Sequence, residues 1–171
     1  NDGNKCLSCF IVEKGTPGLT AGKHEDKMGL RGANTVPLMF ENCEIPEENL
    51  LGRLGDGFKL AMTALDGGRI GIASQAVGTA RAAVEASVKY AKERQAFGNA
   101  IGEFQAVKWM LADMQTQTNA AELLALRAAF LKESKVPFTR EASMAKLFAS
   151  ETSNRVADKA VQIHGGYGYI D

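Results

Sequence analysis

An aspartate, two glycines and an arginine follow one another at positions 66–69, inside a segment whose periodicity predicts one long helix over about 57–94. Glycine in a helix interior costs ~1 kcal/mol relative to alanine, and this interior contains glycines at 67, 68, 71 and 78. On a helical wheel, Asp66 and Arg69 fall within the apolar arc formed by Leu65, Ile72, Ala73, Ala76, Val77, Ala80, Ala83 and Val84. The run is either an Asp–Arg pair whose glycines admit another helix, or a ligand groove in which Gly67 and Gly68 leave room for a substrate.

A second group of residues lies at the predicted C-terminus of the same helix. Arg94 is followed by Phe97 and Gly98, and Gln105 comes a few residues later. Basic residues near the last carbonyls, with a glycine just beyond them, are typical of an ordinary helix end. In a binding site, Arg94 would instead offer its planar guanidinium to a phosphate, and Phe97 would cover an aromatic ring.

A third group closes the last predicted helix with the run Gln162-Ile163-His164-Gly165-Gly166-Tyr167-Gly168-Tyr169. Glycine pairs at a helix end are common caps, and a single histidine is more often a surface or interface residue than a ligand. The same segment could also present backbone N–H groups to a cofactor phosphate or ring, with His164 as a hydrogen-bond donor. The residues alone leave both interpretations open.

The elements that must position these groups fall into two parts. Residues 5–13 and 35–42 read as strands, with 19–23 as a candidate third, and turn signals separate them. A proline and several glycines then form a linker. We therefore expect residues 1–53 to be the end of a β domain and residues 54–171 to be a helical domain.

Two further helices complete the helical part. The second covers about 102–133, and its apolar residues recur at alternating steps of three and four, which suits an antiparallel bundle. Thr139 is expected to cap the third, with Glu141 in its first turn and Gly165-Gly166 at its end. The predicted fold class is mainly α: an antiparallel four-helix bundle with three helices present, whose fourth lies beyond Asp171 in a longer protein.

The composition excludes several classes of function. The chain of 171 residues has 20 basic and 20 acidic residues, so nothing in its charge favours nucleic acid or an anionic membrane as a partner. No apolar run approaches the ~20 residues that span a bilayer. Cys6 and Cys9 form a C-x-x-C pair, but no second ligand pair follows, and residues three apart in a strand face opposite sides. We therefore expect no metal site, and we expect His24 to be solvated.

The order and spacing of the three groups resemble the acyl-CoA dehydrogenase family, from about Phe10 to the end of the chain. The form Asp-Gly-Gly-Arg is most similar to the short-chain, butyryl-CoA branch. The matching signatures are Phe10-Ile11-Val12-Glu13, Thr16-Pro17-Gly18-Leu19, Glu25-Asp26-Lys27-Met28-Gly29-Leu30-Arg31-Gly32, Phe40-Glu41-Asn42-Cys43, Ile45-Pro46, Leu51-Gly52, Gly57-Phe58, Leu65 to Ala73, Arg94 with Phe97-Gly98, and Gln162 to Gly168.

The resemblance implies a fold, a cofactor and a set of site residues. The β part would be the C-terminal end of a barrel-like middle domain. FAD would bind between two subunits of a tetramer that is a dimer of dimers. The residues matching FAD-contacting positions are Arg94, Gln105, Gln162, Ile163, His164, Gly165 and Gly166, with Phe97 in the same wall. Those matching the acyl-CoA channel are Asp66, Gly67, Gly68 and Arg69.

The implied chemistry is α,β-dehydrogenation of an acyl-CoA thioester, with electrons passed to an electron-transferring flavoprotein. A carboxylate would remove the α-proton while a hydride leaves the β-carbon. In most of the family that base is a glutamate that would lie beyond Asp171. A minority places it at the position of Gly68, which cannot abstract a proton. We expect this chain to contain no catalytic base and to be inactive alone.

Two rival interpretations stay open. An acyl-CoA oxidase would share the fold and pass its electrons to oxygen. A non-catalytic helical assembly module would keep the bundle and bind no flavin. The resemblance places the protein in the cytoplasm of a bacterium or in the mitochondrial matrix of a eukaryote.

Overall fold

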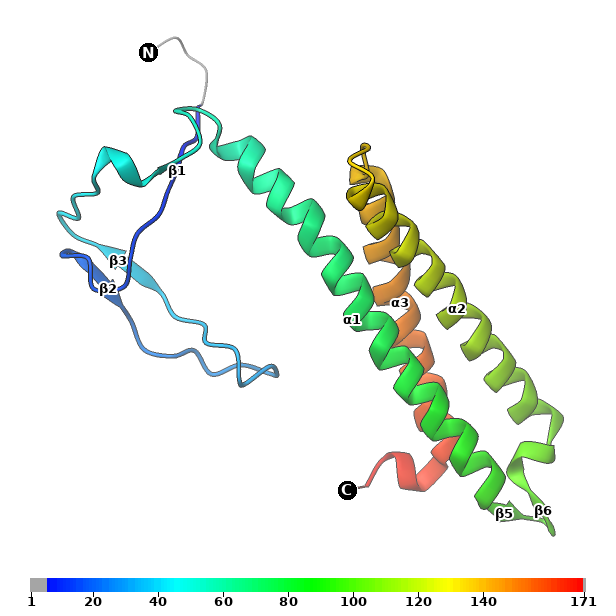
Figure 1. The fold of residues 1–171 in the computed structure, drawn as a ribbon. Helices are drawn as coiled ribbons and strands as arrows, with labels where there is room; N and C mark the ends of the chain where they lie inside the picture. The colour runs from blue at the N-terminus through cyan, green and yellow to red at the C-terminus, as the bar shows by residue number, and fades with distance from the viewer. Residues whose placement is uncertain (1–5, 171) are drawn as a thin grey trace. The chain divides into compact units, whose positions relative to one another are not determined.

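The computed structural model describes residues 6–170, which divide into two compact units between Met62 and Thr63 (Figure 1). The division lies inside helix α1 (Gly57–Glu93), and the boundary expected between residues 53 and 54 stays a prediction. Three parts of the predictions lie outside the described residues: residue 5 of the strand predicted over 5–13, the first five residues of the predicted domain 1–53, and residue 171 of the predicted domain 54–171.

The first unit contains short two-stranded ribbons. Strand β1 (Cys9–Phe10) pairs antiparallel with β4 (Leu50–Leu51), and β2 (Leu19–Ala21) pairs antiparallel with β3 (Leu38–Phe40). The 3-10 turn Glu47–Asn49 lies within the predicted linker. The predicted strands were longer than these, because each described strand has one partner only, and a two-stranded ribbon gains little from extending its ladder.

The helical unit follows the prediction closely. Helix α1 ends at Glu93 and leads into a hairpin of β5 (Gln95–Ala96) and β6 (Asn99–Ala100). A 3-10 turn, Ile101–Glu103, precedes α2 (Gln105–Glu133). Helix α3 (Thr139–His164) ends at Gly165 with φ of 57°, a conformation that favours glycine, and a last 3-10 turn covers Gly165–Gly168.

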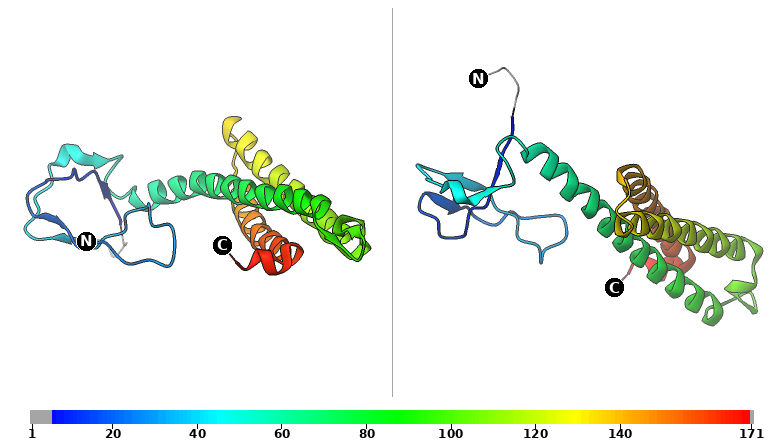
Figure 2. Two further views of the ribbon diagram at one scale, coloured as in Figure 1. Left: turned by 90° about the horizontal axis from the view of Figure 1, so that it is seen from below. Right: turned by 45° about the horizontal axis from the view of Figure 1, so that its top comes forward.

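The three helices lie side by side and run alternately down, up and down (Figures 1 and 2). Two apolar clusters hold α1 against α2 and α3, one around Ala73, Ala121 and Ala145 and the other around Val84, Met114 and Val156. Most of the buried side chains are alanines, whose small size lets helices pack closely. The three- and four-residue repeat predicted for α2 is confirmed at the buried positions Met114, Thr118, Ala121, Ala125 and Ala128, and α3 buries a similar stripe at Ala145, Ala149, Thr152, Val156, Ala160 and Ile163.

The predicted apolar arc of α1 needs one correction. Ala73, Val77, Ala80 and Val84 are buried as expected. Leu65 and Ile72, placed in the same arc, are 51% and 48% exposed. These two residues lie beside the strip of α1 that packs against α2 and α3, because the apolar arc on the wheel is wider than that strip.

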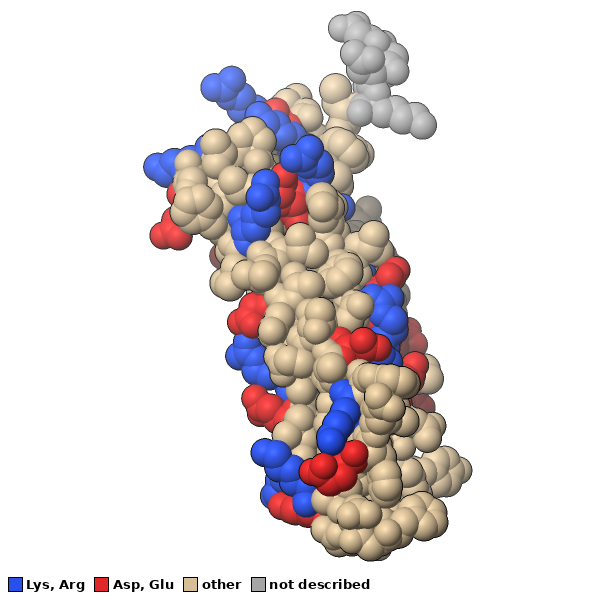
Figure 3. Space-filling view, turned by 90° about the vertical axis from the view of Figure 1, so that its right-hand side faces the viewer, with Lys and Arg blue, Asp and Glu red and all other residues tan. Residues whose placement is uncertain are grey.

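Helix α2 also carries an apolar stripe on its outer face. The exposed large side chains Leu123, Leu126 and Phe130 follow one another at steps of three and four residues, and Trp109 precedes Leu123 by about four turns, so all four lie along one side of the helix. On the face of the molecule in Figure 3, basic and acidic side chains are intermixed around broad uncharged areas. Within the described residues, no helix is both long and apolar enough to cross a membrane.

Candidate functional site

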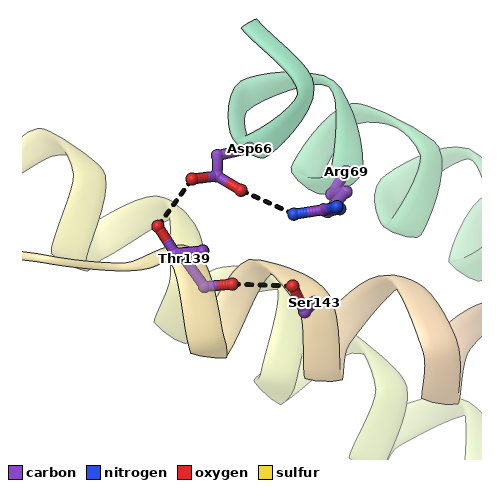
Figure 4. Close-up of polar contacts among 4 residues, drawn as sticks. All are labelled: Asp66, Arg69, Thr139 and Ser143. Atoms are coloured by element: carbon purple, nitrogen blue, oxygen red, sulfur yellow. Dashed lines mark hydrogen bonds and ion pairs between the residues drawn. The ribbon is translucent and has the colours of Figure 1, made fainter. Parts of the chain in front are cut away.

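The aspartate and arginine of the 66–69 run form an ion pair on α1. Asp66 is buried, with 8% of its surface exposed. Arg69 Nη1 donates to Asp66 Oδ1 at 2.6 Å, one helical turn away (Figure 4). The side chain of Arg69 is 35% exposed, so it reaches solvent while it is paired with Asp66. The pair lies toward the helix interface, as the wheel predicted.

Thr139, which the sequence predicted as the cap of α3, forms a second hydrogen bond with Asp66. Thr139 Oγ1 donates to Asp66 Oδ2 at 2.5 Å, and Ser143 Oγ donates to the Thr139 carbonyl at 2.8 Å (Figure 4). The prediction that Thr139 caps α3 is therefore wrong. The N-cap position is Phe138, which makes no side-chain cap hydrogen bond, and the Thr139 hydroxyl contacts another helix instead.

The glycines of α1 do not serve close helix packing. A Cβ placed at Gly68, Gly71 or Gly78 would meet no described atom within 4 Å. At Gly67 the nearest atom would be Lys132 Nζ at 3.2 Å, the flexible end of a side chain. One interpretation of positions 66–69 was that the glycines admit another helix. The structure does not support it at Gly68, because the space beside this residue is open.

That open space is an apolar hollow of about 560 Å³. It is lined by Ala64, Leu65, Gly68, Arg69, Ile72 and Lys146. Leu65 and Ile72 were expected in the core, and their exposure is explained because their side chains form walls of this hollow. Arg69 and Lys146 supply two cations, and no carboxylate is among the described residues that line it. The arrangement suits a ligand with an apolar part and an anionic or strongly polar part.

A second hollow, of about 280 Å³, joins the other two sequence groups at the far end of α1. Arg94 lines it together with Ile163, His164, Gly165 and Gly166. Tyr90, Ile101 and Tyr167 complete its wall. The Arg94 guanidinium carbon lies 5.6 Å from the centre of the Tyr167 ring, so a cation–π contact steadies the side chain.

His164 is held in one orientation. Its Nδ1 lies 2.8 Å from the Ala160 carbonyl oxygen, and its ring stacks on Tyr90 with 4.5 Å between ring centres. Because a carbonyl can only accept, Nδ1 carries the proton of this hydrogen bond. In the neutral imidazole, Nε2 is then an acceptor, and it donates only when the ring is protonated. This restricts the expected role of His164 as a donor to its protonated form.

Three of the predicted residues do not line this hollow in the described structure. Phe97 is at the tip of the β5–β6 hairpin, 97% exposed, where it meets the edge of Phe104 with ring centres 6.3 Å apart. Its φ of 52° is unfavourable for a residue with a side chain. Gln105 is the first residue of α2, and Gln162 lies in the last turn of α3. Both residues are exposed.

Several lining residues were missed by sequence reasoning. Tyr90 precedes Arg94 by one helical turn, so the i, i+4 spacing was a usable signal. Lys146 is one of two lysines on α3, and nothing in the local sequence separates it from a solvated residue. Thr139 is 73 positions from Asp66, so only the structure reveals their contact.

The remaining chemistry-bearing residues give no further site. Cys6, Cys9 and Cys43 are free thiols, and Cys9 Sγ lies 3.6 Å from the Gly57 carbonyl. Among the described residues, no group of three or more His, Cys, Asp or Glu side chains is placed to hold a metal ion.

Comparison with known proteins identifies the family. The domain described as "Acyl-CoA dehydrogenase, C-terminal domain" matches residues 55–171. The mitochondrial short-chain specific acyl-CoA dehydrogenase of Rattus norvegicus is 53% identical over 98% of this chain and 40% of the relative. The caffeyl-CoA reductase–Etf complex subunit CarC of Acetobacterium woodii is 50% identical over 98% of this chain and 44% of the relative.

A solved structure agrees with both relatives. Butyryl-CoA dehydrogenase from Megasphaera elsdenii superposes with a TM-score of 0.94 and is 49% identical, covering 99% of this chain and 44% of that chain. The chain spans less than half the length of these proteins. The resemblance and the fold class predicted from the sequence are thus confirmed, and the chain belongs to the acyl-CoA dehydrogenase family.

Proposed function

We propose that the protein containing this chain oxidises acyl-CoA thioesters to trans-2-enoyl-CoA with FAD as its cofactor, and that its substrates are short. The observation that carries the proposal is the open apolar hollow at Gly68, flanked by the fixed guanidinium of Arg69. The names of the short-chain and butyryl-CoA relatives support the same substrate class.

The residues of this chain have defined tasks toward the thioester. Leu65 and Ile72 give apolar surface, and Gly68 leaves room between them. Arg69 offers hydrogen-bond donors to a polar part of the substrate, and its pairing with Asp66 reduces the conformational freedom lost on binding. Lys146 adds a second positive charge at the same hollow, which favours an anionic group of the coenzyme.

The second hollow fits part of a dinucleotide. Arg94 suits a phosphate, Gly165 and Gly166 leave open space where side chains would stand, and Tyr90, His164 and Tyr167 present aromatic surface. At about 280 Å³ it is smaller than most small-molecule sites, which run from roughly 300 Å³, so these residues would hold only one portion of FAD. When bound, FAD would accept the hydride that leaves the β-carbon of the substrate.

The distance between the hollows supports an assembly of several subunits. Arg69 and Arg94 are separated by most of α1, which at a rise of 1.5 Å per residue places them about 38 Å apart. One cofactor cannot contact both hollows of the same chain at a single reaction centre. We propose that Arg94 and the 162–166 segment serve the site of a second subunit, with Phe97 and Gln105 facing the same cofactor, in a homo-oligomer built as a dimer of dimers. The apolar stripe at Trp109, Leu123, Leu126 and Phe130 supports burial of α2 in such an assembly.

The base that removes the α-proton is proposed to be a carboxylate beyond Asp171. Gly68 has no side chain, and Asp66 is engaged by both Arg69 and Thr139. Neither residue is therefore available to take a proton from a substrate in the hollow.

The electron acceptor is proposed to be an electron-transferring flavoprotein, which the name of the Etf-complex relative supports. That relative is also named a reductase, so a second candidate is the reverse reaction, in which an enoyl-CoA is reduced. The test compares the turnover of crotonyl-CoA with reduced electron-transferring flavoprotein against the turnover of butyryl-CoA with the oxidised form, because a reductase turns over faster in the first direction.

The experiment that tests the proposed function is a comparison of electron acceptors with the FAD-loaded protein and butyryl-CoA. A dehydrogenase reduces ferricenium or an electron-transferring flavoprotein at a rate well above its oxygen consumption. Oxygen consumption equal to substrate turnover would assign an acyl-CoA oxidase. Absence of flavin and of turnover would assign a helical assembly module.

A further inference from the structure

We propose that Thr139 is a positioning residue for the substrate site: its hydroxyl fixes the Asp66 carboxylate so that Arg69 presents its guanidinium to the hollow beside Gly68. The inference rests on the proposed function for the meaning of that hollow. It concerns a residue of α3 that lines no part of the hollow and acts through two others.

The geometry forms a relay of three side chains. Thr139 Oγ1 is 2.5 Å from Asp66 Oδ2, and Asp66 Oδ1 is 2.6 Å from Arg69 Nη1 (Figure 4). Each carboxylate oxygen therefore has one partner, and the two partners come from different helices. Without the Thr139 hydroxyl, Asp66 would be held by Arg69 alone. Because Asp66 and Arg69 both belong to α1, their side chains would then have no hydrogen bond to α3 that limits the rotamers they adopt at the hollow.

The start of α3 is consistent with this use of the hydroxyl. Threonine before or at a helix start often satisfies a free backbone N–H, and such a cap stabilises the helix. Here the α3 N-cap makes no side-chain hydrogen bond, and the Thr139 hydroxyl contacts Asp66 instead. Ser143 donates to the Thr139 carbonyl and ties it to the next turn. The Thr139 hydroxyl therefore bonds to Asp66 of α1 and not to a backbone group of α3.

Helix α3 also reaches the same hollow directly. Lys146 lies two turns after Thr139 on the same side of α3 and lines the same hollow as Gly68. The position of α3 therefore determines both cations of the hollow. It carries Lys146 itself, and it orients Arg69 through Thr139 and Asp66.

The test compares Thr139→Val, which removes the hydroxyl and keeps the shape, with Thr139→Ser, which keeps the hydroxyl. Thr79→Val is the matched control, because the Thr79 hydroxyl bonds only to the Gln75 carbonyl of its own helix. In the intact FAD-loaded protein we expect Thr139→Val to raise KM for butyryl-CoA by about fivefold, which is less than the full effect of losing a hydrogen bond to a charged group, because Thr139 acts on the substrate only through Asp66 and Arg69. We expect kcat to change by less than about twofold, Thr139→Ser to restore KM, and Thr79→Val to have no effect on KM.

A double-mutant cycle shows whether Thr139 acts through Arg69. In an Arg69→Met background, Thr139→Val should raise KM no further, since the relay then has nothing to orient. Additive effects would overturn the proposal, as would an unchanged KM in Thr139→Val or a failure of Thr139→Ser to restore it.

A second readout is independent of catalysis. Phenylglyoxal modifies accessible guanidinium groups, and peptide mass spectrometry reports the rate at Arg69 alone. We expect Thr139→Val to speed labelling of Arg69 by about threefold or more, while labelling of Arg94 stays constant, because an Asp66 carboxylate without its bond to Thr139 restrains the guanidinium less. If the protein binds no acyl-CoA and the Arg69 rate still rises, the relay stands and the proposed function fails. An unchanged Arg69 rate would overturn the relay itself.

Discussion

Replacing Gly68 with alanine should make the protein more stable and its substrate site worse. Gly68 lies inside α1, and a Cβ at this position would meet no described atom within 4 Å. The substitution therefore adds no clash and removes the conformational cost of glycine. We expect the free energy of unfolding to rise by about 0.8–1 kcal/mol.

The same methyl group would enter the hollow between Leu65 and Ile72. A misfit of one methyl group in a binding pocket costs about 1–3 kcal/mol of transition-state binding, which is about 10- to 200-fold in kcat/KM. The hollow is open and measures about 560 Å³, so we expect the lower end of this range. Guanidinium unfolding measures the first effect, and steady-state kinetics with butyryl-CoA measure the second.

Gly71 provides the matched control. It is also exposed on α1 with open space at its Cβ, but it does not line the hollow. Gly71→Ala should give the same gain in stability with kcat/KM unchanged. The reasoning is refuted if Gly68→Ala keeps the full activity of the wild type, or if both substitutions reduce activity equally.

Three other substitutions test the remaining contacts. Asp66→Asn should raise KM for butyryl-CoA and lower the free energy of unfolding by about 1–3 kcal/mol, because it weakens a hydrogen-bonded, partly buried ion pair; an unfolding free energy equal to the wild type would contradict the network. Arg94→Gln should weaken FAD binding by about tenfold or more in a flavin-release titration, as for loss of a charged contact to phosphate, with Lys92→Gln as the exposed control. Lys146→Met should raise KM for butyryl-CoA with little change in kcat, and less so at high salt, where the contribution of the charge is screened; an effect equal to that of Lys89→Met would mean that the charge at the hollow has no specific role.

The helices could be predicted from the sequence because their signals are local. The apolar spacing of α2 and α3 requires a buried stripe, and Gly165 marks the end of α3. The burial of Asp66 followed from its place on the wheel. The resemblance assigned Arg94 and the 162–166 segment to FAD; the structure places Arg94 beside Ile163, His164, Gly165 and Gly166, and their contact with a cofactor stays a prediction.

The misses come from contacts between distant parts of the chain. Thr139 had every local feature of a cap, but Asp66, on another helix, accepts its hydrogen bond. Leu65 and Ile72 share the wheel position of core residues, but the seam with α2 and α3 is too narrow to cover them. The strands of the first unit are shorter than their apolar runs, because a strand's length depends on partners that the run itself does not specify.

The most direct test of the central claim is anaerobic addition of butyryl-CoA to the intact protein purified with its bound cofactor. The account predicts a flavin spectrum before addition, rapid loss of the oxidised flavin absorbance afterwards, and slower reduction with octanoyl-CoA. Faster reduction with octanoyl-CoA would contradict the short-chain assignment. A flavin that stays oxidised with every saturated acyl-CoA, or a protein that binds no flavin, would contradict the proposed function.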